Sequence, residues 1–250
     1  MKITLIGYGK MGHEVESMAL ANKFEISSII DHKEKNATHK ELSKEAIENA
    51  DVIIDFSSPN TIIETITKAA SYKKPLVVGT TGWYDNLEIA KKIVANNNLG
   101  MVYSPNFSIG MNIFFSIARN ASFIIDKFPM YDPYIYEIHH NQKIDSPGGT
   151  AKNLGNILLS NIKRKKRLVF DRIDGRKIES DEIHVGSVRA GFFPGMHVLG
   201  FDGISDNIEL RHTARNRAGF AEGALLAAKW ITDKKGFYSF EEVISSIIKG

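Results

Sequence analysis

The first hundred residues alternate between short apolar runs and longer stretches in which apolar residues recur every three or four positions. The short runs are apolar at nearly every position, which indicates strands buried on both faces of a parallel sheet. The longer stretches predict amphipathic helices that cover this sheet. We predict strands at 2–7, 25–31, 51–57, 75–82 and 100–106, and helices at 14–22, 39–49, 61–72 and 86–97. This order is typical of a doubly wound α/β domain.

The pattern changes after residue 105. A helical stretch at 109–127 leads into an alternating, strand-like segment at 131–140, and a second helical stretch covers 150–162. Four strand-like runs separated by glycine-containing turns follow at 167–173, 181–190, 196–203 and 207–214. We therefore predict an α+β domain over 106–216. Helical periodicity returns at 217–230 and 240–248, so the first domain is predicted to comprise 1–105 plus 217–250.

The composition excludes several classes of protein. Hydrophobic residues at 43% and charged residues at 24% are ordinary for a soluble globular chain, and no apolar run approaches the ~20 residues that a membrane helix needs. A net charge of +3 predicts no nucleic-acid partner. The one basic cluster, KRKKR at 163–167, is interpreted as a solvated linker or helix end rather than a phosphate-binding patch. The chain has no cysteine, and its first residues are too glycine-rich for a signal peptide, so we expect a cytoplasmic protein.

A glycine-rich loop follows the first predicted strand directly and precedes the first predicted helix. Gly7 permits a tight turn, Gly9 lets a pyrophosphate approach the backbone, and Gly12 allows close packing of helix on strand. The amides and the dipole of the helix can then hold phosphates. The candidate phosphate-binding residues are Gly7, Tyr8, Gly9, Lys10, Met11 and Gly12.

Asp31 ends the second predicted strand, where a carboxylate can accept a hydrogen bond from the 2′-hydroxyl of an adenosine ribose. Its charge favours NADH over NADPH, although His32, Lys33 and Lys35 could attract a 2′-phosphate. Asp31 could instead only cap the segment that follows, and Ser57 could likewise cap the next helix. Further candidates for contacts with a dinucleotide lie at later strand ends: Gly79, Thr80, Thr81, Ser104, Pro105, Asn106 and Phe107.

Residues 136–155, YEIHHNQKIDSPGGTAKNLG, combine titratable side chains with a helix start. His139 and His140 can donate protons near neutral pH, although strand alternation sends them to opposite faces. Lys143 suits an anion, and Gly149 and Thr150 would present amides at a helix N-terminus that can bind a carboxylate or a phosphate. Adjacent histidines are poorly spaced for one metal ion and no third ligand is evident, so we predict no metal site.

Taken in order, these motifs resemble the dihydrodipicolinate reductase family of lysine biosynthesis over nearly the whole chain. The resemblance rests on GYGKMG, DFSSP, GTTG, SPNFSIGMN, EIHHNQKIDSPGGTA, SVRAG and HTARNRAGFAEGALLAAKW. It implies an NAD(P)H-dependent oxidoreductase with a Rossmann-type dinucleotide-binding domain at 1–105 plus 217–250. It also implies a substrate-binding and oligomerisation domain at 106–216 with an open mixed sheet, often assembled as a homotetramer.

The resemblance also implies residue roles. His139 and Lys143 match the acid/base histidine and the lysine proton donor, and His140, Gly149 and Thr150 match positions that bind a carboxylate of a small cyclic dicarboxylate substrate. The glycine loop, Asp31, Gly79–Thr81 and Ser104–Phe107 would hold the cofactor.

Two positions depart from the family pattern. Gly148 stands where the family usually has serine, which removes a hydroxyl that could bind substrate, and His32 stands where many members have arginine, which favours NADH. Two other functions remain compatible with the sequence: reduction of a different imine, enal or sugar, and dinucleotide sensing without catalysis.

Overall fold

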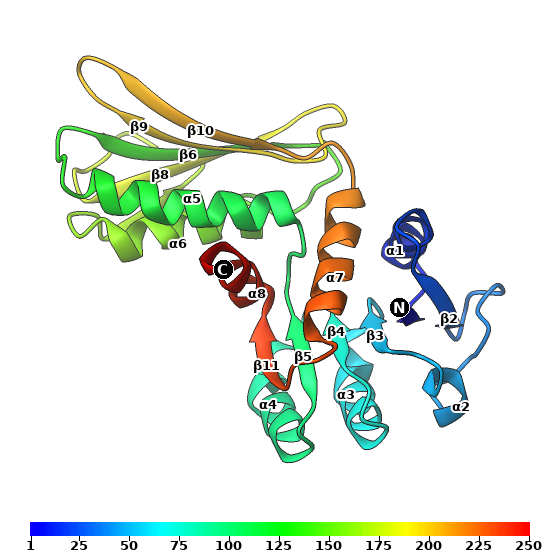
Figure 1. Cartoon of the computed structure of the whole chain (residues 1–250). Helices are drawn as coiled ribbons and strands as arrows, with labels where there is room; N and C mark the ends of the chain where they lie inside the picture. The colour runs from blue at the N-terminus through cyan, green and yellow to red at the C-terminus, as the bar shows by residue number, and fades with distance from the viewer. The chain divides into compact units, whose positions relative to one another are not determined.

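A computed structural model describes all 250 residues, which divide into two compact units. Unit 1 comprises Met1–Asn112 and Arg217–Gly250, and unit 2 comprises Ile113–Asn216. Figure 1 follows the chain through both units. The sequence-based division places the first boundary after residue 105 instead, and the binding role assigned to each domain stays a prediction.

Unit 1 contains a six-stranded sheet in which all neighbouring strands are parallel, in the order β11-β5-β4-β3-β1-β2. Its strands are β1 (Lys2–Ile6), β2 (Glu25–Ile30), β3 (Val52–Asp55), β4 (Leu76–Val78), β5 (Gly100–Tyr103) and β11 (Gly236–Ser239). Its helices are α1 (Lys10–Ala21), α2 (Lys44–Ile47), α3 (Ile62–Ser71), α4 (Leu87–Asn96), α7 (Ala218–Ile231) and α8 (Phe240–Lys249). The strand order reverses between β1 and β3, and ligands bind at such a switch point.

Both faces of this sheet are buried, as the uniformly apolar strands predict. Leu5 and Ile54 belong to a core cluster with residues of α1, α7 and α8, whereas Ile53 and Val78 belong to a second cluster with residues of α3 and α4. The prediction of a doubly wound parallel sheet is therefore confirmed.

The structure differs from the sequence-based expectations at three local points. The segment 39–49 forms only the short helix α2, because Ile30 forms a bridge with His39 and the chain stays extended there. Strand β11 was not predicted, since GFYS has only four residues between two helices. Ser58, not Ser57, caps the 3₁₀ helix Pro59–Thr61, and the Ser57 hydroxyl donates to Asp55 Oδ1 at 2.8 Å.

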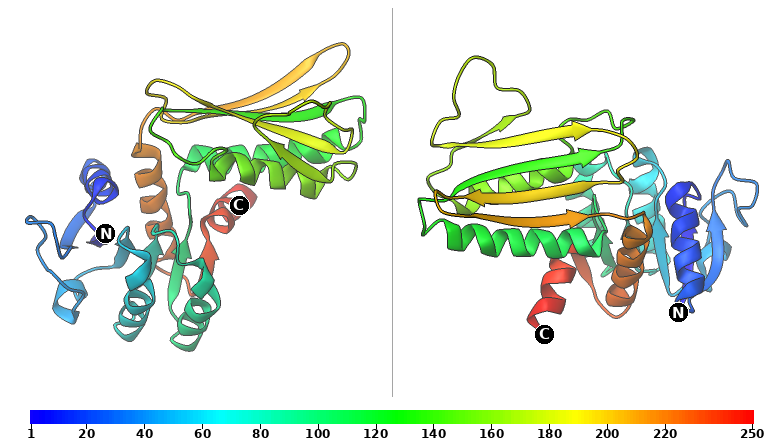
Figure 2. Two further views of the ribbon diagram at one scale, coloured as in Figure 1. Left: turned by 180° about the vertical axis from the view of Figure 1, so that it is seen from behind. Right: turned by 90° about the horizontal axis from the view of Figure 1, so that it is seen from above.

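Unit 2 contains a five-stranded mixed sheet in the order β10-β9-β6-β8-β7, in which β6 pairs in parallel with β8 and antiparallel with β9. Its strands are β6 (Asp132–His139), β7 (Arg167–Phe170), β8 (Glu182–Arg189), β9 (Met196–Asp202) and β10 (Asn207–Thr213). Helices α5 (Ile109–Ile125) and α6 (Gly149–Asn161) lie along one face, and no helix covers the other (Figure 2). The predicted open mixed sheet is confirmed.

The basic run 163–167 is not wholly solvated. Lys165 is only 2% exposed, and its Nζ donates to the carbonyl oxygens of Ser180 at 2.9 Å and Glu182 at 2.8 Å and pairs with Asp132. The interpretation as a solvated segment is therefore wrong for Lys165, because the start of β8 surrounds its ammonium group with acceptors.

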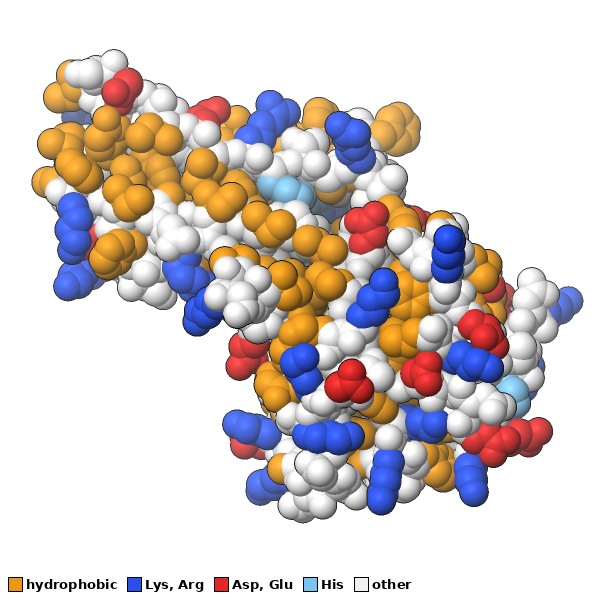
Figure 3. Space-filling model, in the orientation of Figure 1, with side chains coloured by type: hydrophobic (Ala, Val, Ile, Leu, Met, Phe, Trp, Pro, Cys, Tyr) orange, Lys and Arg blue, Asp and Glu red, His pale blue; other side chains and the backbone are white.

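Apolar side chains gather on the surface over α5 (Figure 3). Ile117, Phe123 and Ile124 of this helix are 46%, 63% and 56% exposed. None of the helices combines the length and the apolar character needed to cross a membrane.

Candidate active site

The buried face of β6 carries two titratable residues at its carboxyl end. Burial alternates along this strand, so Glu137 and His139, two positions apart, point to the same buried side and are 0% and 9% exposed. His140 follows the end of the strand, where its backbone N–H donates to the Phe193 carbonyl at 2.8 Å. His139 is thus held by a strand end, whereas His140 is held by a loop.

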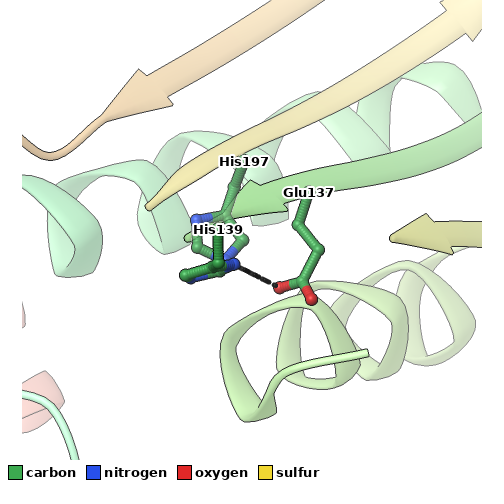
Figure 4. A group of neighbouring side chains, drawn as sticks. All are labelled: Glu137, His139 and His197. Carbon is green, nitrogen blue, oxygen red and sulfur yellow. Dashed lines mark ion pairs between the residues drawn. The ribbon is translucent and has the colours of Figure 1, made fainter. Parts of the chain in front are cut away.

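Neighbouring strands bring further polar side chains to this point. In the register of the sheet, Glu137 lies opposite His197 of β9, and His139 lies opposite Arg189 of β8. Figure 4 shows Glu137 and His139 projecting from β6 and His197 from β9, with the three side chains converging.

Glu137 forms the centre of this cluster. Its Oε1 accepts from Arg189 Nη2 at 2.7 Å and from the backbone N–H of Gly148 at 2.8 Å, while its Oε2 lies 3.3 Å from His197 Nε2 and 3.5 Å from His139 Nδ1. Burial by itself raises the pKa of a carboxyl group, but these partners favour the charged form and lower the pKa of Glu137 to about 2. The carboxylate is therefore charged although it is fully buried.

For His139, in contrast, burial outweighs the effect of its charged partner and favours the neutral form of the ring. Burial lowers its pKa to about 4, and the attraction of Glu137 only partly opposes this effect. His197, Lys143 and Arg189 lower it further by repulsion. Its Nδ1 is buried beside Glu137, while its Nε2 lies beside Gly195, where an added Cβ would approach Nε2 to 3.1 Å. Gly195 has φ +152°, a conformation that other residues rarely adopt.

We expect acid to destabilise the protein through these two groups. The pKa of Glu137 is lowered from 4.5 to about 2, so its contribution is complete above pH 4.5 and is lost as the pH falls towards 2. The pKa of His139 is lowered from 6.5 to about 4, so its contribution is lost as the pH falls from 6.5 towards 4. Glu137 alone should account for about 3 kcal/mol of the free energy of unfolding.

Urea unfolding at a series of pH values measures this dependence. The Glu137→Gln variant should lose the part of the decline that lies below pH 4.5. An equal decline in variant and wild type would show that Glu137 is not its source.

The start of α6 faces the same cluster. Gly148 is the N-cap, and the exposed Gly149 and the half-buried Thr150 open the first turn, where amides lack partners within the helix. The ammonium group of Lys143 donates to Asp145 Oδ1 at 2.6 Å in the preceding loop. The geometry thus combines a helix N-terminus that suits a carboxylate with a histidine that can transfer a proton.

Gly148 itself is tightly enclosed. A Cβ at this position would lie 3.0 Å from Glu137 Oε2 and 3.0 Å from Lys143 Cε. A serine here would therefore require the ends of both side chains to shift by a few tenths of an ångström.

The cluster also contains three potential metal ligands, because atoms of Glu137, His139 and His197 lie within 4.8 Å of one another. The sequence showed no third ligand beside the paired histidines, since His197 is remote in the chain. Arg189 already neutralises Glu137, so we favour an ion-pair network over a divalent cation at this point.

Sequence analysis thus missed three residues of the cluster: Glu137, Arg189 and His197. Glu137 could have been found, because it lies two positions before His139 on a predicted alternating strand. Arg189 belongs to the SVRAG motif, but the motif alone gives no partner for it. His197 could not have been placed without the pairing of β9 with β6.

In unit 1 the glycine loop has the expected local geometry. Gly7 has φ +84°, and a Cβ there would lie 2.4 Å from the Phe56 carbonyl oxygen. A Cβ on Gly12 would lie 2.3 Å from the Gly7 carbonyl oxygen, whereas Gly9 is open, with no atom within 4 Å of an added Cβ. The loop therefore fits an approaching pyrophosphate at Gly9.

Asp31 lies next to this loop. Its carboxylate accepts from the backbone N–H groups of Tyr8 at 2.8 Å, Lys33 at 2.8 Å and Glu34 at 3.1 Å, as the capping alternative predicts. Burial opposes ionisation, but these three hydrogen bonds, with His32, lower its pKa. A carboxylate has about four acceptor positions, so one remains for a ribose hydroxyl. A cavity of about 780 Å³ is lined by Asp31, Gly7, Gly9 and Ser57, among others.

The later cofactor candidates differ in accessibility. Thr80 is buried and donates to Asp55 Oδ1 at 2.7 Å, and Phe107 is 2% exposed and packs against Phe240. Thr81 and Pro105 are exposed. A contact of Phe107 with a cofactor would have to use its backbone. The roles of these residues stay predictions, as do those of Tyr8, Lys10, Met11, Gly79, Ser104 and Asn106.

Known proteins of one family match this chain over nearly its whole length. Residues 1–107 match the family described as "Dihydrodipicolinate reductase, N-terminus", and residues 110–244 match "Dihydrodipicolinate reductase, C-terminus". The chain is 35% identical over 251 residues, all of both chains, to a 4-hydroxy-tetrahydrodipicolinate reductase of Christiangramia forsetii. It is 34% identical over 247 residues, 97% of this chain and 100% of the relative, to the enzyme of the same name from Staphylococcus aureus.

A solved structure has the same fold. The dipicolinate-bound dihydrodipicolinate reductase from Paenisporosarcina sp. TG-14 superposes with a TM-score of 0.78 at 24% identity, covering 97% of this chain and 99% of the other. From the two matched halves and the full-length relatives it follows that this chain belongs to the dihydrodipicolinate reductase family.

Proposed function

We propose that this protein is an NAD(P)H-dependent reductase that converts 4-hydroxy-tetrahydrodipicolinate into tetrahydrodipicolinate with loss of water, in the diaminopimelate route to lysine. The observation that carries this proposal is the meeting of His139, Glu137 and the start of α6 within one unit. Full-length relatives that bear the name of this enzyme support it.

The residues of unit 1 suit a dinucleotide. Gly9 would admit the pyrophosphate, the first turn of α1 would hold it, and Asp31 would accept from the ribose of NADH. When bound, the reduced nicotinamide supplies the hydride for the reaction. The charge of Asp31 would repel a 2′-phosphate, so we propose NADH as the preferred cofactor.

The residues of unit 2 suit a small cyclic dicarboxylate. The amides of Gly149 and Thr150, together with His140, would bind one carboxylate, and Lys143 would exchange Asp145 for a negatively charged group of the substrate. His139 would protonate ring C3 after reduction at C4. A neighbouring dianion raises the pKa of a histidine, so bound substrate would charge His139, which is neutral at pH 7 in the free protein.

A coupled assay tests the proposal. A synthase generates 4-hydroxy-tetrahydrodipicolinate from pyruvate and aspartate semialdehyde, and NADH oxidation is followed by absorbance. Rapid oxidation that depends on the synthase supports the reductase. A folded protein that binds NADH but does not oxidise it would instead fit the alternative of a dinucleotide sensor. Oxidation of NADH only with a different imine or enal would show that the enzyme acts on another substrate.

The charge of Asp31 should set cofactor preference. We expect Asp31→Asn to reduce kcat/KM with NADH about 10- to 100-fold, because a hydrogen bond to a charged group contributes about 1.5–3 kcal/mol. The ratio of NADPH to NADH efficiency should rise, since the repulsion is removed. Asp51→Asn is the matched control, because Asp51 also accepts a backbone N–H, that of Lys2 at 2.7 Å. An unchanged ratio would show that Asp31 does not select the cofactor and only caps the segment that follows it.

We propose further that the protein forms a homotetramer. The sheet face of unit 2 that no helix covers, and the exposed apolar side chains of α5, are available for such contacts. A cytoplasmic location, favoured by the absence of cysteine, stays a prediction.

A further inference from the structure

In the proposed reaction the buried carboxylate of Glu137 neither binds the substrate nor transfers a proton. Resting on the proposed role of His139 as proton donor, we infer that Glu137 is a positioning residue. Its carboxylate holds the Nδ1 edge of His139 inward, so that Nε2 delivers the proton. The same carboxylate also binds the backbone N–H of Gly148, the residue that caps α6.

The two nitrogens of His139 lie in different surroundings. Nδ1 is buried and has no hydrogen-bond partner in this structure, and the Glu137 Oε2 atom lies 3.5 Å from it, at ion-pair distance, whereas Nε2 lies beside Gly195. A charged carboxylate can only accept hydrogen bonds, so the nitrogen that faces it carries hydrogen in both protonation states of the ring. Nε2 is then the nitrogen that gains and loses the proton. Because Gly195 has no side chain, the Nε2 edge of His139 is not covered by a Cβ at this position.

The second oxygen of Glu137 connects this histidine to the helix start. Oε1 accepts the N–H of Gly148 at 2.8 Å and the guanidinium of Arg189 at 2.7 Å. Both oxygens belong to one rigid planar group, so the turn that would bind substrate carboxylate and the ring that would donate the proton share one anchor. Arg189 also reaches the Asp145 carbonyl oxygen, which extends the anchor into the Lys143 loop.

The charges around His139 come from several elements. His197 of β9 and Arg189 of β8 face Glu137, and Lys143 with Asp145 approaches from the loop before α6. Among them, Glu137 is the negative group next to Nδ1. Removing its charge therefore makes His139 harder to protonate. Because the reaction consumes the proton on His139, the decline of kcat at high pH should move to lower pH.

Glu137→Gln tests this role, because glutamine keeps the length of the side chain and an acceptor for Gly148 but can also present N–H to His139. We expect kcat to fall about 100-fold with a smaller change in KM, since general acid catalysis contributes about 100- to 10,000-fold. The solvent deuterium isotope effect on kcat should rise as protonation becomes limiting. Glu182→Gln is the matched control: Glu182 is a buried carboxylate of β8, paired with Arg176 at 2.6 Å, in the same sheet.

A double variant separates positioning from general stabilisation. Adding Glu137→Gln to His139→Ala should cost less than threefold more, because residues that act through one another are not additive. A full additional 100-fold loss would show that Glu137 acts independently of His139 and would overturn the inference. If the wild type itself does not turn over the substrate, the proposed function fails, which is a distinct result.

The tautomer of His139 gives a test that needs neither activity nor a variant. In ¹⁵N-histidine-labelled wild type at neutral pH, long-range proton–nitrogen correlations should show Nδ1 protonated. Protonation at Nε2 in the neutral ring would contradict the inference even if Glu137→Gln does not fold.

Discussion

His139→Ala should reduce kcat about 100- to 10,000-fold with 4-hydroxy-tetrahydrodipicolinate, because alanine cannot supply the proton that ring C3 requires. The proposed dinucleotide-binding residues lie in unit 1 and His139 in unit 2, so the affinity for NADH should be unchanged. The coupled absorbance assay measures the first quantity, and fluorescence titration with NADH measures the second.

His184→Ala is a suitable control for this change. His184 is a half-buried histidine of the same sheet, and its Nε2 lies 2.7 Å from the Asp171 carbonyl oxygen, away from the Glu137 cluster. The control should retain nearly full activity. If kcat of His139→Ala stayed within a few-fold of the wild-type value, the proton donor would have to be another group. Lys143 would be the first to examine.

Lys143→Ala should also reduce kcat/KM strongly. Whether kcat or KM changes identifies the role of the lysine. If Lys143 mainly holds a substrate carboxylate, KM should rise, with a loss of about 1.5–3 kcal/mol from one charged hydrogen bond. If it donates a proton or stabilises charge in the transition state, kcat should fall about 100-fold or more at little cost in KM. We expect the fall in kcat to dominate, following the role implied by the family signature.

The control for Lys143 is Lys152→Ala, an exposed lysine in the first turns of α6. It tests whether loss of one positive charge near this helix start is sufficient to lower activity. Equal losses in both variants would indicate a general electrostatic effect rather than a specific contact of Lys143.

Local patterns predicted much of the fold. Uniformly apolar strands identified a sheet buried on both faces, and the glycine spacing after β1 placed a tight turn, which Gly7 forms with φ +84°. Short or tertiary-dependent elements escaped prediction. GFYS becomes strand β11 only because β5 offers an edge, and Lys165 is buried only because backbone acceptors from another strand surround it.

The candidate site shows the same division. His139, Lys143 and the start of α6 lie within about a dozen residues of sequence, so their proximity could be inferred. The partners that set the charge of the site come from β8 and β9, and only the strand register brings Arg189 and His197 to Glu137. The pKa of about 4 for His139 follows from burial, which no local pattern reveals.

The return of the chain to unit 1 after residue 216 affects how the protein is made. Nine of the nineteen buried residues in the core cluster beneath α1 come from α7 and α8, which are synthesised after the whole of unit 2. The continuous segment 113–216 can complete its own sheet while translation is still in progress, because domains fold as units as they emerge. The nascent amino-terminal strands, in contrast, have one face only partly covered, by α1, until α7 and α8 have been synthesised.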